Sequence, residues 1–210
     1  MVFHPFKHFG PSLHAGVLQQ DIVEAIPFEM QRLRQVHGTA VVEVESIGEE
    51  VEGDALITHS TDVPLLIKTA DCIPLVFADE TTGWIGGIHA GWRGLTADIV
   101  PLTFARMAEK GVQMANIKVG IGPSLGVECS QFSKPHEEIP VKYHWAIREQ
   151  GHVDLWAILE QQLSELGILK GNVEWMRVCT ACNPEWFSWR RDADARRFGT
   201  IIAKVPAKAL

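Results

Sequence analysis

The sequence is poor in cysteine and in basic residues, and it contains no long apolar run. No stretch of about 18 apolar residues occurs, so no membrane-spanning helix is expected. The N-terminal residues lack the basic and apolar regions of a secretory signal. Nineteen Lys and Arg stand against 26 Asp and Glu, a net charge of −7, which disfavours nucleic acid as a partner. We therefore expect a cytoplasmic protein that binds neither membranes nor nucleic acids.

The four cysteines are too few for a disulfide framework in a chain of 210 residues, and a cytoplasmic protein would keep them reduced. Two of them, Cys179 and Cys182, have the C-x-x-C spacing of redox pairs and zinc knuckles. No second C-x-x-C occurs, and no thioredoxin-like βαβ pattern surrounds this one. The spacing is therefore interpreted as incidental.

The apolar pattern predicts many short strands in one domain. With 46% hydrophobic residues, the chain is long enough for a single well-packed domain over residues 1–210. Alternating or continuous apolar segments predict strands at 41–45, 54–58, 64–69, 73–78, 84–89, 117–123, 173–178 and 201–205. A turn at residues 79–83 is expected to pair the fourth and fifth of these.

Two amphipathic segments predict helices at residues 95–110 and 153–166, ended by Gly111 and Gly167. Helices and strands follow one another without a strict βαβ rhythm. The pattern predicts an α+β fold with mixed β-sheets.

A glycine-rich stretch at residues 86–94 holds a histidine and an arginine four positions apart, His89 and Arg93. Its glycines let the backbone turn sharply and let other atoms approach closely. Two further segments offer metal ligands at strand ends, His37 in Q-V-H-G and Cys72 in T-A-D-C. Two imidazoles and one thiolate suit Zn²⁺ with an open fourth position. Alternatively, the histidines are structural and Cys72 is a small buried hydrophobe.

Four neighbouring residues complete the candidate site, each with a structural alternative. Asp71 would orient a ligand imidazole or exchange protons, or bond its own backbone in a turn. Arg93 would clamp a phosphate, or form a salt bridge across the glycine turn. Trp92 would stack on a base, or belong to the core. Arg190 would provide a second cationic point, or a surface salt bridge with its neighbours.

At these residues the chain resembles the proteins once named multicopper polyphenol oxidases, or laccase-domain proteins. Many are now described as zinc-containing purine nucleoside phosphorylases with adenosine deaminase activity. The matching strings are Q-V-H-G at 35–38, G-D-A at 53–55, T-A-D-C at 69–72, H-A-G-W-R-G at 89–94, I-G-P at 121–123, C-T at 179–180 and F-S-W-R-R-D at 187–192. The resemblance implies mixed sheets in a central core flanked by helices. It also implies metal ligands at His37, Cys72 and His89.

The resemblance further implies a zinc enzyme whose partners are purine nucleosides and phosphate. A Zn²⁺ ion held by the three ligands would activate water for attack on C6 of adenosine, with Asp71 moving the proton. In phosphorolysis, phosphate held by Arg93 or Arg190 would attack C1′ of the ribose. Family members usually have a longer region before Q-V-H-G, so the phosphate contact is less defined than the metal site.

Three alternatives stay open. Copper-dependent phenol oxidation matches the older family name and a Cys–His₂ site, but the chain lacks the paired His-x-His strings of a copper cluster. A metal-free hydrolase would use Cys72 as nucleophile with His89. A non-catalytic binding protein would keep only the fold. The preferred nucleoside, the balance of the two reactions and the oligomeric state are not determined by the sequence.

Overall fold

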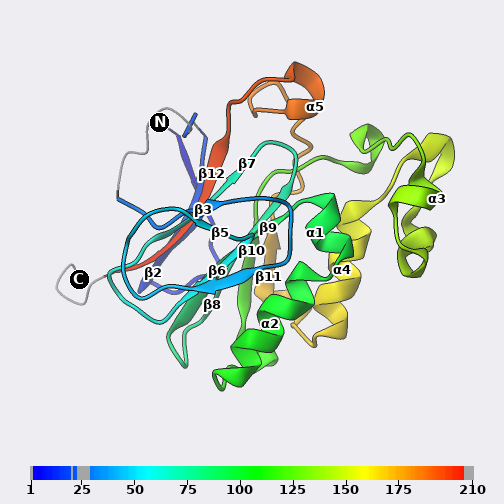
Figure 1. The fold of residues 1–210 in the computed structure, drawn as a ribbon. Helices are drawn as coiled ribbons and strands as arrows, with labels where there is room; N and C mark the ends of the chain where they lie inside the picture. The colour runs from blue at the N-terminus through cyan, green and yellow to red at the C-terminus, as the bar shows by residue number, and fades with distance from the viewer. Residues whose placement is uncertain (1, 20, 23–28, 206–210) are drawn as a thin grey trace.

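The computed structural model describes residues 2–19, 21–22 and 29–205, and the other residues are drawn as a grey trace in Figure 1. The expected domain over residues 1–210 thus reaches outside the described residues at both ends. Part of the segment that precedes Q-V-H-G, residues 20 and 23–28, also lies outside them.

The described strands form three sheets. A six-stranded sheet has the order β11-β10-β8-β9-β6-β4, a four-stranded sheet the order β1-β2-β12-β7, and β3 pairs with β5. The bounds are β1 Phe3–Pro5, β2 Leu13–Leu18, β3 Leu33–Arg34, β4 Val41–Glu43, β5 Val51–Glu52, β6 Ala55–Thr58, β7 Leu65–Thr69, β8 Ile73–Asp79, β9 Trp84–Ala90, β10 Lys118–Ile121, β11 Val173–Trp175 and β12 Phe198–Lys204. Parallel and antiparallel pairs both occur, so the predicted α+β fold with mixed sheets is confirmed.

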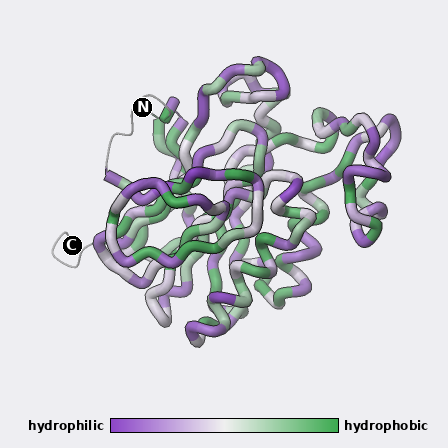
Figure 2. The backbone as a smooth tube through the Cα atoms, in the orientation of Figure 1, coloured by the Kyte–Doolittle hydropathy of each residue, from purple (hydrophilic) through white to green (hydrophobic). Residues whose placement is uncertain are grey.

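The six-stranded sheet is the middle layer of three, between the four-stranded sheet and the helices (Figure 1). Successive side chains of a strand point to opposite faces. In β8, Leu75 and Phe77 therefore join a core with the helical residue Phe104, whereas Val76 joins a second core with Ile202 of β12. Because both faces are covered, the central strands are largely apolar, as the green stretches inside the fold show (Figure 2).

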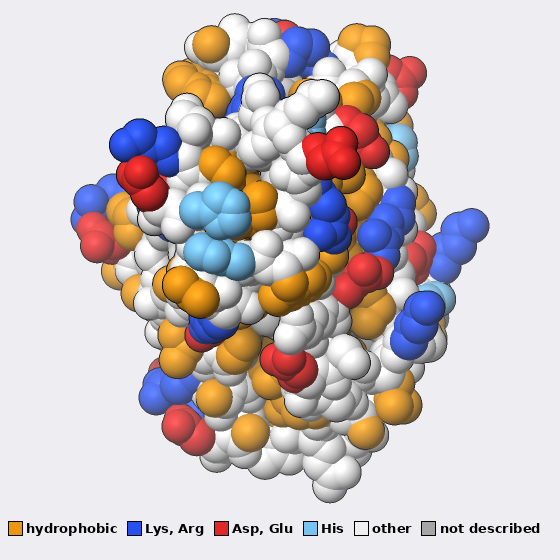
Figure 3. All heavy atoms as spheres, turned by 90° about the vertical axis from the view of Figure 1, so that its right-hand side faces the viewer, with side chains coloured by type: hydrophobic (Ala, Val, Ile, Leu, Met, Phe, Trp, Pro, Cys, Tyr) orange, Lys and Arg blue, Asp and Glu red, His pale blue; other side chains and the backbone are white. Residues whose placement is uncertain are grey.

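The helices lie on one side of the sheets and the short helix α5 at one end (Figure 1). Their bounds are α1 Trp92–Thr96, α2 Ile99–Glu109, α3 Pro135–Glu138, α4 Leu155–Glu165 and α5 Trp189–Asp192, with 3₁₀ turns η1 Met114–Asn116, η2 Val127–Cys129, η3 Val141–Ala146, η4 Glu149–Gly151 and η5 Lys170–Asn172. None of the described helices is long and apolar enough to cross a membrane. On the helical side, acidic, basic and apolar side chains are interspersed (Figure 3).

Each predicted strand overlaps a strand of the structure, and the predicted hairpin between β8 and β9 is present. The helix predicted at 153–166 is α4, whose N-cap Asp154 accepts a hydrogen bond from Ala157 N at 3.0 Å. The strand β2 was missed because Ala15 and Gly16 have low strand propensity. Its pairing with β12 places Gly16 opposite Ile201.

The single helix predicted at residues 95–110 is wrong: the structure has two helices, α1 and α2. Asp98 separates them, with a left-handed backbone at φ 68°. Its carboxylate accepts hydrogen bonds from Tyr143 Oη at 2.7 Å and Gln162 Nε2 at 3.3 Å. These partners lie far along the chain, so a local periodicity cannot reveal the break.

Candidate metal centre

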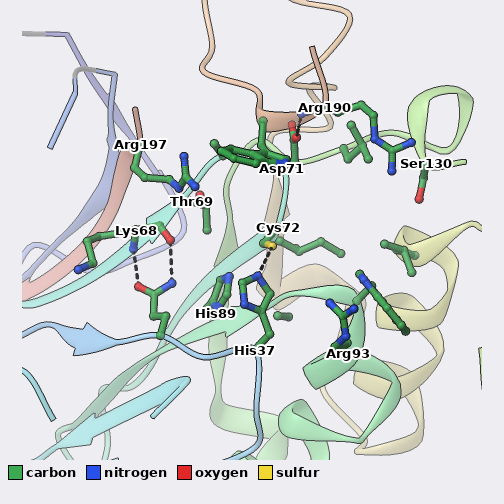
Figure 4. Close-up of a pocket in the computed structure, with 18 of the residues that line it drawn as sticks. His37, Lys68, Thr69, Asp71, Cys72, His89, Arg93, Ser130, Arg190 and Arg197 are labelled. Atoms are coloured by element: carbon green, nitrogen blue, oxygen red, sulfur yellow. Dashed lines mark hydrogen bonds between the residues drawn. The ribbon is translucent and has the colours of Figure 1, made fainter. Parts of the chain in front are cut away.

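The three candidate ligands come together from separate elements. His37 follows β3, Cys72 lies between β7 and β8, and His89 lies near the end of β9. Each offers a ligand atom within 4.8 Å of the other two. Cys72 Sγ is 3.6 Å from His37 Nε2, and the two imidazole rings are 4.8 Å apart in an edge-to-face arrangement. Figure 4 shows all three side chains directed into one cavity.

A fully buried carboxylate, Asp54, positions two of the three residues. Its side chain is 0% exposed and accepts a hydrogen bond from His89 Nδ1 at 2.7 Å. It also accepts from the backbone N–H groups of Val36 (3.3 Å), His37 (2.9 Å) and Gly38 (2.7 Å). The Nδ1 bond leaves Nε2 of His89 free for a metal, as in carboxylate–histidine–metal arrangements. Asp54 lies within one of the matching strings, G-D-A, but it was not among the predicted site residues.

Two glycines of the H-A-G-W-R-G string make room for the loop that carries His37. A Cβ atom at Gly91 would lie 2.5 Å from His37 Cδ2 and 3.2 Å from Cys72 Sγ. A Cβ atom at Gly94 would lie 2.7 Å from the carbonyl oxygen of Gly38. Both positions therefore favour glycine, because a side chain at Gly91 would press on the candidate ligands and one at Gly94 would press on the backbone of the Q-V-H-G loop.

Gln35, the first residue of the Q-V-H-G string, fixes that loop to β7. Its Nε2 donates to the carbonyl oxygen of Lys68 at 2.8 Å, and its Oε1 accepts from Lys68 N at 3.0 Å. This pair of bonds imitates one rung of a sheet. The string therefore combines a ligand with the two anchors, Gln35 and the 37–38 amides, that hold it in place.

The charges of the cluster stabilise one another. Burial raises the pKa of the Cys72 thiol, but the charge of His89 and the hydrogen bond with His37 outweigh it and lower that pKa to about 6. Burial lowers the pKa of His89, but the Cys72 charge and the Asp54 hydrogen bond raise it to about 9. Burial also raises the pKa of Asp54, yet its bonds from His89 and the 37–38 amides hold it below the usual value. At neutral pH the metal-free cluster therefore contains a thiolate beside an imidazolium.

The cluster lines a cavity of about 650 Å³. Its walls carry five basic side chains, Arg34, Lys68, Arg93, Arg190 and Arg197, and three aromatic ones, Trp92, Phe132 and Trp189. Figure 4 shows Lys68 and Arg197 on one side of the cluster and Arg93 on the other. Lys68 pairs with Glu50 and Arg34 with Glu52. Within the described part of the chain, the other three basic side chains form no ion pair, which leaves them available for an anionic ligand.

Arg93 and Trp92 both lie on the cavity wall. The guanidinium carbon of Arg93 is 4.4 Å from the centre of the Trp92 ring, and Trp92 contacts Phe132 edge to face at 5.3 Å. The salt bridge considered for Arg93 does not form among the described residues. Trp92 is only partly buried and packs against the core while facing the cavity.

Asp71 holds a distant loop rather than a ligand imidazole. Its Oδ1 accepts from Thr180 Oγ1 and its Oδ2 from the backbone N–H of Arg190, both at 2.6 Å. Its backbone has φ 88°, a left-handed conformation that is strained in a residue with a side chain. The carboxylate that orients the His89 imidazole is therefore that of Asp54. Asp71 does not bond its own turn through the carboxylate, since its partners lie 109 and 119 residues away.

Arg190 and Arg191, which follow the F-S-W segment at 187–189, have different surroundings. Arg190 lines the cavity, and its Nη1 donates to the carbonyl oxygen of Gln131 at 2.9 Å. Arg191 instead donates to the carbonyl oxygens of Thr180 and Trp186 and pairs with Asp192. Lys68 and Arg197 were not among the predicted site residues. A lysine within the otherwise apolar strand before T-A-D-C was the available signal for Lys68.

Comparisons with known proteins show which proteins this chain is similar to. The profile of the family described as "Multi-copper polyphenol oxidoreductase laccase" matches residues 18–206. A purine nucleoside phosphorylase of Deinococcus radiodurans is 33% identical over 79% of this chain, and the match spans 66% of that protein. One from Clostridium acetobutylicum is 30% identical over 82% of this chain and 76% of its own length. The adenosine deaminase RL5, from an unknown prokaryote, is 28% identical over 75% and 68%.

Solved structures show the same fold. A Neisseria meningitidis protein of the DUF152 family superposes with a TM-score of 0.84 at 21% identity, covering 97% of this chain and 99% of that one. YlmD from Geobacillus stearothermophilus has a TM-score of 0.80 at 22% identity, with 93% of each chain covered. With the profile matching nearly all of the described residues, the chain belongs to the multi-copper polyphenol oxidoreductase laccase family.

Proposed function

We propose that this protein is a zinc-dependent enzyme of purine nucleosides that carries out phosphorolysis of adenosine- and inosine-type nucleosides and deaminates adenosine. One observation carries the metal part of the proposal: two imidazoles and a thiol converge within 4.8 Å, and a buried carboxylate holds one imidazole by Nδ1. The substrate part is supported by the names of the relatives, purine nucleoside phosphorylase and adenosine deaminase.

The donor set fits zinc. Cys72 has a depressed pKa and therefore offers a thiolate, and His89 presents Nε2 because Nδ1 is engaged by Asp54. His37 would be the third ligand, which leaves an open position toward the cavity. When bound there, zinc would supply a Lewis acid that activates water or polarises the substrate. The remaining work falls to the side chains of the cavity.

The cavity walls offer the contacts that a nucleoside and phosphate require. Trp92 and Trp189 present aromatic faces on which a purine can stack. Arg93 and Arg190 are cations without an ion-pair partner among the described residues, and a guanidinium can bind a phosphate through two parallel hydrogen bonds. In phosphorolysis these cations would hold the phosphate for attack on C1′ and stabilise the charge that develops.

Asp71 remains our candidate for proton transfer in deamination, because it lines the cavity beside Cys72. Its two hydrogen bonds, from Thr180 and from the Arg190 backbone, also make it a positioning residue for the wall that bears Trp189 and Arg190. The two roles are separable: loss of the proton transfer would affect deamination, whereas loss of the wall would affect both reactions.

One observation favours a second candidate, a metal-free hydrolase. Cys72 is a thiolate at neutral pH beside the imidazolium of His89, which is the state of an activated cysteine nucleophile. The family description also names a polyphenol oxidoreductase, and a Cys–His₂ donor set is compatible with copper. The experiment must therefore separate zinc, copper and metal-free chemistry.

Metal removal followed by reconstitution makes this separation. The metal-free protein is assayed for ammonia release from adenosine, for phosphate-dependent cleavage of inosine and for oxidation of a phenol, before and after adding Zn²⁺ or Cu²⁺. We expect Zn²⁺ to restore both nucleoside reactions. Full activity without metal would favour the cysteine hydrolase, and phenol oxidation only with copper would favour the oxidase. If the zinc-loaded protein converts none of these substrates, the result would favour a non-catalytic binding protein.

A further inference from the structure

Three of the four cysteines meet at a second place in the molecule. Cys129 ends the 3₁₀ turn η2, and Cys179 and Cys182 lie in the loop between β11 and α5. Their three Sγ atoms lie within 4.8 Å of one another, and the Sγ atoms of Cys129 and Cys182 are 3.3 Å apart. All three are free, and Cys182 is exposed. We call this group the thiol cluster.

The backbone builds this cluster by running two loops side by side. Ser124 and Cys179 form a parallel bridge, supported by the hydrogen bonds Ser124 N to Val178 O and Thr180 N to Ser124 O, both 3.1 Å. The C-x-x-C turn is closed by Asn183 N, which donates to Cys179 O at 3.1 Å. The first loop then continues into η2 and brings Cys129 against the turn.

Gly126 allows the two loops to approach this closely. A Cβ atom there would lie 3.1 Å from Cys179 Cβ and 3.3 Å from its Sγ. Its N–H donates to Cys179 Sγ at 3.2 Å. Burial raises the pKa of Cys179, but this bond and the amide of Cys182 outweigh it and lower the pKa. A sulfur that receives amide hydrogen bonds is prepared to carry negative charge.

The other two thiols lack such support. Burial and the neighbouring thiols Cys182 and Cys179 raise the pKa of Cys129 to about 12. Three thiolates within 4.8 Å repel one another unless a cation lies between them. The carboxylate of Glu128 adds negative charge at the same place, since its Oε2 lies 3.2 Å from where a Gly126 Cβ would stand. The cluster therefore offers three soft ligand atoms, and no cationic side chain contacts them in the hydrogen bonds and ion pairs described.

We propose that Cys129, Cys179 and Cys182 bind a second, thiophilic metal ion of the Zn²⁺ type, at a site separate from His37, Cys72 and His89. Zinc binds thiolates in structural sites that often contain three or four cysteines. As the ion binds, each thiol releases its proton to solvent. A disulfide between Cys129 and Cys182 would need an oxidant and would leave unexplained why Cys179 converges with them and receives amide hydrogen bonds.

The site would fasten a wall of the main cavity. The loop after the C-x-x-C turn leads into α5, which carries Trp189 and Arg190. An ion held by Cys129 and by the turn would tie this segment to the loop at residues 124–130. The proposal does not depend on the reaction that the main cavity catalyses.

Counting bound zinc tests the proposal without an activity assay. The full chain is purified with a reductant, stripped of metal and titrated with Zn²⁺ against a chromophoric chelator. We expect two equivalents to bind to the parent protein and one to the Cys182→Ser variant. The Cys72→Ala variant is the matched control: it is expected to keep the equivalent that Cys182→Ser loses. The double variant is expected to bind none.

The outcomes separate the two sites. If Cys182→Ser binds as much zinc as the parent, or if Cys129 and Cys182 are found as a disulfide under reducing conditions, the proposal is overturned. If the parent binds one equivalent that Cys182→Ser abolishes, the thiol cluster stands and the zinc proposal for the histidine site fails. A second readout is the Cys129→Ser variant, which is expected to lose the same equivalent; circular dichroism verifies that each variant is folded.

Discussion

The described part of the chain contains two clusters of side chains that could hold a metal ion, and the pKa values of Cys72 in one and of Cys129 in the other are shifted in opposite directions. In the cluster of His37, Cys72 and His89, a buried carboxylate and two imidazoles surround one thiol. In the cluster of Cys129, Cys179 and Cys182, thiols face one another at the surface. The pKa of Cys72 falls to about 6, whereas that of Cys129 rises to about 12. A cysteine side chain is therefore a thiolate at neutral pH in one place and a protonated thiol in the other.

The contrast shows how neighbouring groups ionise a thiol before any metal is bound. Cys72 is ionised in advance by His89, which Asp54 holds in turn. The three sulfur atoms of the thiol cluster already lie close together, but a cation is needed to stabilise them as thiolates. The Cys72 site has an ionised thiol and lines a large basic and aromatic cavity, which is typical of a catalytic metal site. The cysteines of the thiol cluster do not line that cavity, which is typical of a structural metal site. The predictions below test this contrast in order of expected effect.

Removing the prepared thiolate is expected to have the largest effect. Cys72→Ala removes the soft ligand of the His37, Cys72 and His89 cluster, so both nucleoside activities should fall to background while the fold persists. Ammonia release and phosphorolysis are measured beside the metal content and the circular dichroism spectrum. His8→Ala, an exposed histidine outside the site, serves as the control and should behave as the parent. Unfolding of Cys72→Ala would instead assign the cluster a structural role.

Removing the buried carboxylate should weaken the site without emptying it. Asp54→Asn keeps the shape but loses the charge that orients His89, and we expect metal affinity to fall about 10–100-fold. The control is Asp79→Asn, which is equally buried but bonds only Thr81 and Thr82 in the β8–β9 turn. It should cost stability and leave zinc affinity unchanged. Equal affinity losses in both variants would contradict a specific role for Asp54.

The pH dependence of alkylation compares the two clusters directly in the metal-free protein. The folded-state pKa of Cys72 is lowered to about 6, so its thiolate persists as pH falls to 6 and is lost below it. Between pH 7 and pH 5 the rate of its reaction with iodoacetamide should drop about tenfold, in step with the thiolate fraction. Cys129, whose pKa is about 12, should react slowly across this range. Peptide mass spectrometry separates the four cysteines; comparable rates for these two would remove the contrast.

The smallest effect concerns the basic cavity wall, which the thiol cluster lacks. Arg93→Lys keeps the charge but loses the planar two-point contact, which we expect to cost roughly 1 kcal/mol, about fivefold, in phosphorolysis. Deamination, which needs no phosphate, should change little. Arg106→Lys, on the exposed face of α2, is the matched control. Equal losses in both reactions would mean that Arg93 holds the nucleoside or the loop rather than phosphate.

Most of the strands and the candidate ligand residues could be predicted from the sequence alone. Apolar segments predicted β6, β8 and β9 because both faces of the central sheet are buried, and Gly167 predicted the end of α4. His37, Cys72 and His89 were recognisable because ligand chemistry and short strings are local properties. A likeness in these strings also indicated the family to which the profile assigns the chain.

Only the tertiary structure decided the contacts that join residues far apart in sequence. Asp54 bonds to His89 and to the Q-V-H-G loop, and Asp71 bonds to Thr180. The helical segment is interrupted at Asp98, and Cys129 lies against the C-x-x-C turn. The C-x-x-C spacing looked incidental because its third thiol lies 50 residues or more away along the chain. Such contacts depend on how sheets and loops pack, and a side chain's partner across a packed interface leaves no periodic signal in its own segment.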